Sequence, residues 1–254
     1  MKILKVLKDF IRKSERYRVP GDLVEFVNSL KLEKPEIYEK ILLGFSNYNI
    51  KKAVECMRTG GVVLFFARPT YGFATSGFSK EGVERIYKIK GRDYKKPLSV
   101  ISNKRDITKW AILSEDNKEI VRKIVNLYWP GNVSIILKKK IHADGKPIIP
   151  EFVTSGFDTV NLMCMDEVAV KLSKTADFPI AATSANISGH KPVIDPIDGI
   201  IKFGDVVDLM LLGPRSDVGV NTTIVDLTAN PPKLVREGPV RYEELKNILP
   251  NLRR

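Results

Sequence analysis

The chain has 254 residues, 43% of them apolar, and a formal net charge of +12 at pH 7. This length can bury the core of one large domain, or of one domain with an appendage. The apolar runs are much shorter than the roughly 18 residues that span a membrane, and the N-terminus interleaves Lys with apolar residues instead of forming a signal-peptide core. We therefore expect a cytoplasmic protein without a membrane anchor.

The first predicted elements are helices. An amphipathic pattern begins at residue 2, with apolar side chains on one face and Lys and Arg on the other, and further helical patterns cover residues 22–30 and 35–43. We expect residues 1–47 to form a helical extension whose first helix packs on the main body. A helix lying on a membrane surface is the alternative, but its apolar face is short.

Helical and strand patterns then alternate without an internal repeat. The predicted helices cover residues 49–59, 79–89, 115–128, 166–176, 196–203 and 241–249, and the predicted strands cover 62–66, 98–101, 133–138, 159–164, 179–183, 206–212, 223–227 and 233–236. The order predicts an α/β domain over 48–254, a twisted sheet of parallel and antiparallel strands flanked by helices. Functional side chains are expected at the strand ends, where rigid strands aim the residues that follow.

Basic residues concentrate in two stretches. Residues 1–19 contain seven Lys or Arg against two acids, and residues 85–109 contain nine against two. Such clusters favour a polyanionic partner, because binding releases counterions from its phosphates. The alternative is a charged surface that serves only solubility.

The sequence gives little support for a metal site or a disulfide framework. Its only cysteines are Cys56 and Cys164, its only histidines are His142 and His190, and neither pair has the spacing of a zinc site. No protein-bound metal is predicted, and Mg²⁺ is expected only together with a nucleotide.

Polar residues follow two predicted strands and one predicted helix. The strand at 62–66 breaks into Arg68-Pro69-Thr70-Tyr71, which is typical either of a substrate loop or of a simple corner. The helix at 79–89 is followed by Lys90, Arg92 and Lys96, which could converge on a phosphate or, for Lys90, only complement the helix dipole. Ser184, Asn186 and Ser188 follow the strand at 179–183, either as a shared hydrogen-bonding face or as a turn.

Taken in order, several short strings resemble the YrdC-like family, which includes the threonylcarbamoyl-AMP synthases. The strings are Tyr71-Gly72, Lys90-Gly91-Arg92, Lys96-Pro97-Leu98, Trp129-Pro130-Gly131 with Ser134, Thr183 to Gly189, Thr222 to Leu227 and Leu234 to Gly238. The resemblance covers about residues 48–240. It implies a twisted α/β fold with a concave, positively charged face.

The resemblance also implies an activity, the formation of threonylcarbamoyl-AMP and pyrophosphate from L-threonine, bicarbonate and ATP, for the threonylcarbamoyladenosine modification of tRNA. Catalysis would fall to Lys90 and Arg92, nucleotide binding to Arg92, Lys96, Pro130, Ser184, Asn186 and Arg236, and substrate binding to Tyr71, Ser134 and Ser184, with Arg68 as a further cation. These groups would act by positioning the reactants and neutralising developing charge.

The sequence departs from the family pattern where threonine would bind. The motif PTETVYG is replaced by Phe66 to Gly72, which places Pro69 at a threonine-binding position, and the family's His and Arg fall on Ile101 and Met163. The change from Arg to Met removes a charge-assisted partner for the amino-acid carboxylate. We expect that the phosphate-binding part of the site is retained and that the threonine-binding part has changed. Arg68 is the one candidate to restore a positive charge there.

Three hypotheses follow. The leading one is an L-threonylcarbamoyladenylate synthase that uses ATP. The second is a non-catalytic paralogue that binds double-stranded RNA or tRNA through its basic face. The third is carbamoyl-adenylate chemistry on a different acceptor. The sequence does not predict an oligomeric state.

Overall fold

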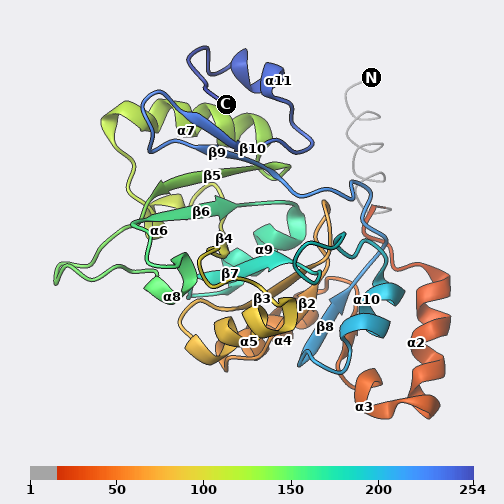
Figure 1. Ribbon diagram of the computed structural model, residues 1–254. Helices are drawn as coiled ribbons and strands as arrows, with labels where there is room; N and C mark the ends of the chain where they lie inside the picture. Colours follow the sequence, from red (N-terminus) through yellow and green to blue (C-terminus); the bar gives the residue numbers. More distant parts are fainter. Residues whose placement is uncertain (1–15) are drawn as a thin grey trace.

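The computed structural model describes residues 16–254 of the chain (Figure 1). The amphipathic helix that we expect from residue 2 lies outside the described residues. Among the helices of residues 16–254, none combines the length and the apolar character that a membrane crossing requires.

In this part of the chain, ten strands form one sheet in the order β1-β8-β2-β3-β7-β4-β6-β5-β9-β10. The strands are β1 (Ile41–Leu43), β2 (Val63–Phe65), β3 (Gly72–Ser76), β4 (Ser99–Ile101), β5 (Val133–Lys138), β6 (Thr159–Met163), β7 (Ile180–Ser184), β8 (Leu209–Leu212), β9 (Thr223–Asp226) and β10 (Lys233–Arg236). Strand β8 pairs in parallel with β1 and β2, as β4 does with β6 and β5 with β9, and the other neighbours are antiparallel. The mixed sheet confirms the predicted fold class.

Helices flank the sheet and connect its strands (Figure 1). They are α2 (Gly21–Glu33), α3 (Pro35–Tyr38), α4 (Asn47–Arg58), α5 (Lys80–Lys90), α6 (Ile107–Trp110), α7 (Glu115–Tyr128), α8 (Glu151–Thr154), α9 (Glu167–Thr175), α10 (Pro196–Phe203) and α11 (Tyr242–Lys246). Helices α4 and α5 pack on β3, and α7 packs on β5.

Both ends of helix α5 are fixed by their capping residues. The Ser79 hydroxyl accepts a hydrogen bond from the Gly82 amide at 3.0 Å and begins α5. That helix ends at Gly91, whose φ of +54° is a left-handed value that favours glycine. The turn at Gly91 therefore sets the direction in which the chain leaves α5 immediately after Lys90.

Three local predictions differ from the structure. The helix expected over 35–43 is wrong beyond Tyr38, because Ile41–Leu43 form β1 and pair with β8. Strand β3 was not predicted, because its sequence GFATS begins with Gly and also contains Ala and Ser, which leaves only Phe73 and Thr75 as residues typical of strands. The strand expected over 206–212 begins only at Leu209.

The described part of the N-terminal segment shares the core of the main body. The side chains of Leu23, Val27 and Leu30 from α2, and of Ile37 from α3, are buried in the same apolar cluster as the central strands. Removing this segment would expose apolar area that now supports the β8 side of the sheet.

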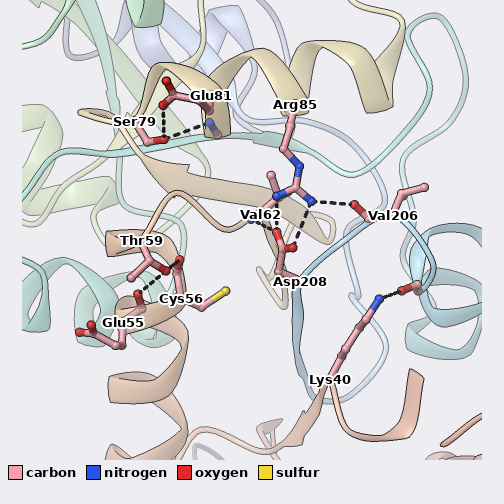
Figure 2. Close-up of polar contacts among 12 residues, drawn as sticks. Lys40, Glu55, Cys56, Thr59, Val62, Ser79, Glu81, Arg85, Val206 and Asp208 are labelled. Atoms are coloured by element: carbon pink, nitrogen blue, oxygen red, sulfur yellow. Dashed lines mark hydrogen bonds and ion pairs between the residues drawn. The ribbon is translucent and has the colours of Figure 1, made fainter. Parts of the chain in front are cut away.

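One carboxylate connects three elements at the other end of β2 from the site (Figure 2). Asp208, just before β8, accepts hydrogen bonds from the backbone amide of Val62 at 2.6 Å and from Nη1 and Nη2 of Arg85 in α5 at 2.7 and 3.1 Å. Burial, together with the charge of Asp208, raises the pKa of the neighbouring Cys56 thiol to about 11. Asp208 thus satisfies a backbone donor and a guanidinium from two other elements.

The substitution Asp208→Ala should lower the free energy of unfolding by about 1–3 kcal/mol, because it leaves the Val62 amide and Arg85 without their acceptor. Urea denaturation measures this change. The control is Asp177→Ala, which removes the exposed partner of Arg58 and should have little effect. Equal losses in the two variants would show that the Asp208 contacts are no stronger than an ordinary surface pair.

Candidate functional site

A cavity of about 400 Å³ is lined by residues from several strands of the sheet. Its walls include residues of β2, β3, β7, β4, β6, β5, β9 and β10, together with the loops at 67–71, 90–98, 184–189 and 221–222. The strand order brings these segments together although they come from most of the length of the chain. The cavity is therefore built by most of the sheet and not by one local motif.

Most of the residues named from the sequence line this cavity. Those that do are Tyr71, Lys90, Arg92, Lys96, Ser184, Asn186 and Arg236. Those that do not are Arg68, Pro130 and Ser134. The side chains grouped by the KGR, KPL and SAN strings thus meet in one place.

The charge of the lining is positive. Among the described residues, the cavity wall contains four cationic side chains and no Asp or Glu. Holding several cations close together without an anion is unfavourable, so the arrangement fits a ligand with several negative charges. It does not fit a protein-held metal, and in residues 16–254 no group of three or more His, Cys, Asp or Glu is placed to hold one. A divalent ion would have to be held by the ligand's own phosphates.

Lys90 is the most buried of the four cations, with 1% of its surface exposed. Its Nζ donates to the backbone oxygens of Ser184 and Asn186, the latter at 2.9 Å, and to Asn186 Oδ1 at 2.9 Å. The Ser184 hydroxyl donates to the same Asn186 Oδ1 at 2.7 Å. Burial, together with the charge of Arg92, lowers the pKa of Lys90 to about 7. Lys90 thereby connects the end of α5 to the turn after β7.

Arg92 and Arg236 approach the cavity from distant parts of the chain. Arg92 donates through Nε to the Lys96 carbonyl at 3.1 Å and through Nη2 to the Pro97 carbonyl at 2.9 Å. Arg236 donates through Nε to the Thr222 carbonyl at 2.9 Å. Burial lowers the pKa of both guanidinium groups, and the charge of Arg92 lowers that of Arg236 as well. The two cations therefore repel each other unless an anion lies between them.

The loop before β3 is held by the segment after β8. The hydroxyl of the buried Tyr71 donates to the carbonyl of Gly213 or Pro214, each at 3.0 Å. The Ser216 hydroxyl donates to the Ala67 carbonyl at 2.8 Å, and the Gly219 amide donates to the Pro69 carbonyl at 2.9 Å. Apart from the bond of the Tyr71 hydroxyl, these contacts are made by carbonyl groups of the loop and fix its main chain whatever side chains stand at positions 67 to 69.

Arg68 extends from this loop but does not line the cavity. Its Nε donates to Asp217 Oδ1 and Oδ2 at 3.1 and 3.2 Å, and its Nη2 to Oδ2 at 3.1 Å. The Arg68 amide donates to Asp166 Oδ2 at 2.7 Å. Burial raises the pKa of Asp166 to about 6. The guanidinium is thus neutralised by Asp217, outside the space where a ligand would lie.

Ser134 lies behind the cavity wall, whereas Pro130 is exposed and does not line the cavity. Ser134 is buried, and its hydroxyl lies 2.7 Å from that of Thr222, which does line the cavity. Arg236 Nη2 donates to the same Thr222 hydroxyl at 3.3 Å. Ser134 can therefore act on a ligand only through Thr222. The Trp129-Pro130 peptide bond is cis.

Two lining residues were missed by the sequence reasoning. Asn161 in β6 donates through Nδ2 to the Ser99 hydroxyl in β4 at 2.7 Å, and both residues line the cavity. They are neighbours in the β4–β6 register. An amide side chain in a strand of otherwise apolar residues was the available signal, and it gained meaning only once the pairing was known.

The fold and the lining define an α/β protein with a cationic, ligand-sized cavity across its sheet. The sequence profile of the Sua5/YciO/YrdC family, described as "Telomere recombination", matches residues 55–238. The chain belongs to this family.

Two of its relatives are named for one reaction. The chain is 30% identical to the threonylcarbamoyl-AMP synthase of Pyrococcus abyssi over 207 residues, which are 81% of this chain and 58% of the relative. It is 29% identical to the threonylcarbamoyl-AMP synthase of Bacillus subtilis over 215 residues, 82% of this chain and 58% of the relative. The chain thus spans less than two thirds of the length of these proteins.

A solved structure agrees with the family assignment. The crystal structure of P. abyssi Sua5 complexed with L-threonine has a TM-score of 0.73 and 28% identity, and the match covers 82% of this chain and 59% of that one. The structure of Escherichia coli YciO, at a TM-score of 0.66 and 22% identity, covers 76% of this chain and 91% of that one and shares the fold.

The substitution Lys90→Met should remove a pH-dependent part of the stability. The pKa of Lys90 in the folded chain, about 7, lies below the ordinary value of 10.5, so between these values the unfolded chain holds the extra proton and stability rises with pH. The unfolding free energy of the wild type minus that of the variant should therefore grow by about 1–4 kcal/mol between pH 7 and pH 10.

Urea denaturation of both proteins across this pH range measures the difference. Lys88→Met, at an exposed position of the same helix, is the matched control and should give a difference that stays flat. A flat difference for Lys90→Met as well would mean that the buried ammonium keeps its ordinary affinity for protons.

Proposed function

We propose that the chain binds ATP in this cavity and forms an adenylate of the threonylcarbamoyl type. The observation that carries the proposal is the lining of four cations without a carboxylate among the described residues, in a chain of the family to which the named synthases belong. A nucleoside triphosphate supplies the negative charge that such a lining requires.

The reaction begins with an amine, L-threonine in the name of the relatives, and bicarbonate, which combine to a carbamate with loss of water. A carbamate oxygen attacks the α-phosphorus of ATP. The bond from that phosphorus to the oxygen bridging to the β-phosphate breaks, and pyrophosphate leaves with the electron pair. The products are the carbamoyl adenylate and pyrophosphate.

Several side chains have plausible tasks in this step. Arg92, Lys96 and Arg236 would neutralise the phosphates, with the forked guanidinium groups pairing two oxygens at a time. Lys90 would keep the turn of Ser184 and Asn186 in place, since its hydrogen bonds already go to that turn. The protein would act by positioning and electrostatics, and Mg²⁺ would be held by the nucleotide phosphates.

In this proposal the adenylate serves the threonylcarbamoyladenosine modification of tRNA. That role is carried over from the family resemblance and not from a feature of the cavity.

The substitution Arg92→Ala should weaken ATP binding by about 10- to 100-fold, because it removes a charged partner of the phosphates. Titration calorimetry measures the affinity, and release of pyrophosphate from ATP with and without L-threonine and bicarbonate measures the reaction. Arg68→Ala is the matched control, because that guanidinium pairs with Asp217 outside the cavity. Equal losses for the two variants would place the nucleotide elsewhere. Tight ATP binding with no amine-dependent release would refute the synthase activity.

A second function rests on the basic residues that do not line the cavity. Lys88, Lys95, Lys104 and Arg105 are exposed, and within residues 16–254 none of them forms an ion pair. Exposed cations without a partner suit double-stranded RNA or tRNA, which is bound largely through phosphate contacts.

If RNA binds there, the double variant Lys104→Ala, Arg105→Ala should reduce the slope of log affinity against log salt by about 2. Fluorescence anisotropy with a labelled RNA duplex over a salt series gives the slope. Lys51→Ala, Lys52→Ala removes two exposed cations of α4 and should leave the slope unchanged. The same slope for all three proteins would exclude this surface as the RNA site.

A further inference from the structure

One end of the cavity differs in character from the rest. We call it the apolar end and define it by Ala67, Pro69, Met163 and Met165, which all line the cavity. Ala67, Met163 and Met165 are buried. Residues 67 and 165 lie close together, because their neighbours Arg68 and Asp166 are joined by a hydrogen bond of 2.7 Å. A ligand that fills the cavity would place one of its groups against this uncharged surface.

The ionisable groups next to the apolar end do not favour an anion. Arg68 is the cation of this loop, and three hydrogen bonds of 3.1–3.2 Å pair it with Asp217 outside the cavity. Asp166 adds a second carboxylate behind the wall. Arg68 is therefore accompanied by two acidic groups, which would repel a carboxylate of the ligand. The charge of Lys104 also acts on Cys164, but Lys104 is exposed and does not line the cavity.

Three of the four cations of the lining are fixed to other segments, and the fourth, Lys96, precedes β4 at the end of that strand opposite to Ile101. Lys90 uses its hydrogen atoms on Ser184 and Asn186, and Arg92 contacts the carbonyls of residues 96 and 97. Arg236 contacts Thr222. The residues beside Met163 in the sheet are Ile101 and Ser134, both uncharged. A carboxylate at the apolar end would lose its water and gain no charged partner, which is strongly unfavourable.

We infer that the amine substrate is recognised at the apolar end through an uncharged group and not through a carboxylate. This inference rests on the proposed function, because it specifies the amine of the same reaction. The substrate class is a primary amine that carries an apolar or neutral polar group where an amino acid carries its carboxylate. L-Threonine, the ligand of the P. abyssi structure, would gain nothing here from its carboxylate.

The test compares L-threonine with 1-amino-2-propanol, which keeps the amine, the methyl and the hydroxyl of threonine and lacks only the carboxylate. Titration calorimetry measures the binding of each to the protein loaded with a non-hydrolysable ATP analogue, or to the free protein if the analogue does not bind. We expect 1-amino-2-propanol to bind at least as tightly as L-threonine. Weaker binding of 1-amino-2-propanol by more than threefold, or no binding of either amine, would overturn the inference.

A gain-of-function variant provides an independent test. Met163→Arg adds a cation to the apolar end and should raise the affinity for L-threonine at least tenfold without raising that for 1-amino-2-propanol. Leu127→Arg adds the same charge at an exposed position of α7 that does not line the cavity, and it should change neither affinity. If both Met163→Arg and the wild type bind L-threonine equally, in variant protein that unfolds cooperatively, the inference is wrong.

Pyrophosphate release tests the proposed function separately. Release of pyrophosphate with 1-amino-2-propanol and bicarbonate would support both the synthase activity and the recognition of an amine without a carboxylate. Binding of that amine without release from ATP would refute the synthase activity and leave the recognition of an uncharged amine standing.

Discussion

The site depends on a buried ammonium group. An amine withdrawn from water is stable in the charged form only where acceptors surround it, and the oxygens around Lys90 belong to the turn that follows β7. Helix α5 and that turn therefore cannot move independently of each other. Arg92 follows one residue after the glycine that ends the helix, so the contact that fixes the turn also brings a second cation to the cavity. An anionic ligand would relieve the repulsion between these charges and thereby tighten the site.

In the loop before β3, the groups that hold the loop in place are not the side chains that it presents to a ligand. Its carbonyl groups and the Tyr71 hydroxyl are bound by the segment after β8, and none of these bonds requires a particular side chain at positions 67 to 69. The loop can therefore keep its path while the groups that it presents to a ligand change. This division explains how the path of the loop can be kept while the end of the cavity that it lines is uncharged.

The sequence was sufficient for the fold class and for most of the cavity lining. Periodicity located helices such as α7, and the family strings grouped residues that the sheet does bring together, including Lys90, Ser184 and Arg236. Strand β1 could not be predicted, because its three residues continue a helical pattern and become a strand only through pairing with β8. The position of Arg68 outside the cavity could not be predicted either, since its partner Asp217 lies far along the chain. In both cases a long-range contact overrides the local signal.

The position of β1 bears on how the domain should be delimited for study. The family profile begins at residue 55, yet Ile41–Leu43 occupy one side of β8 in the sheet. A fragment cut to the profile would leave the amide and carbonyl groups of β8 unpaired along an apolar strand, and such an edge is a template for association with other chains. Aggregation of a trimmed fragment would then report a missing strand and not an unstable domain.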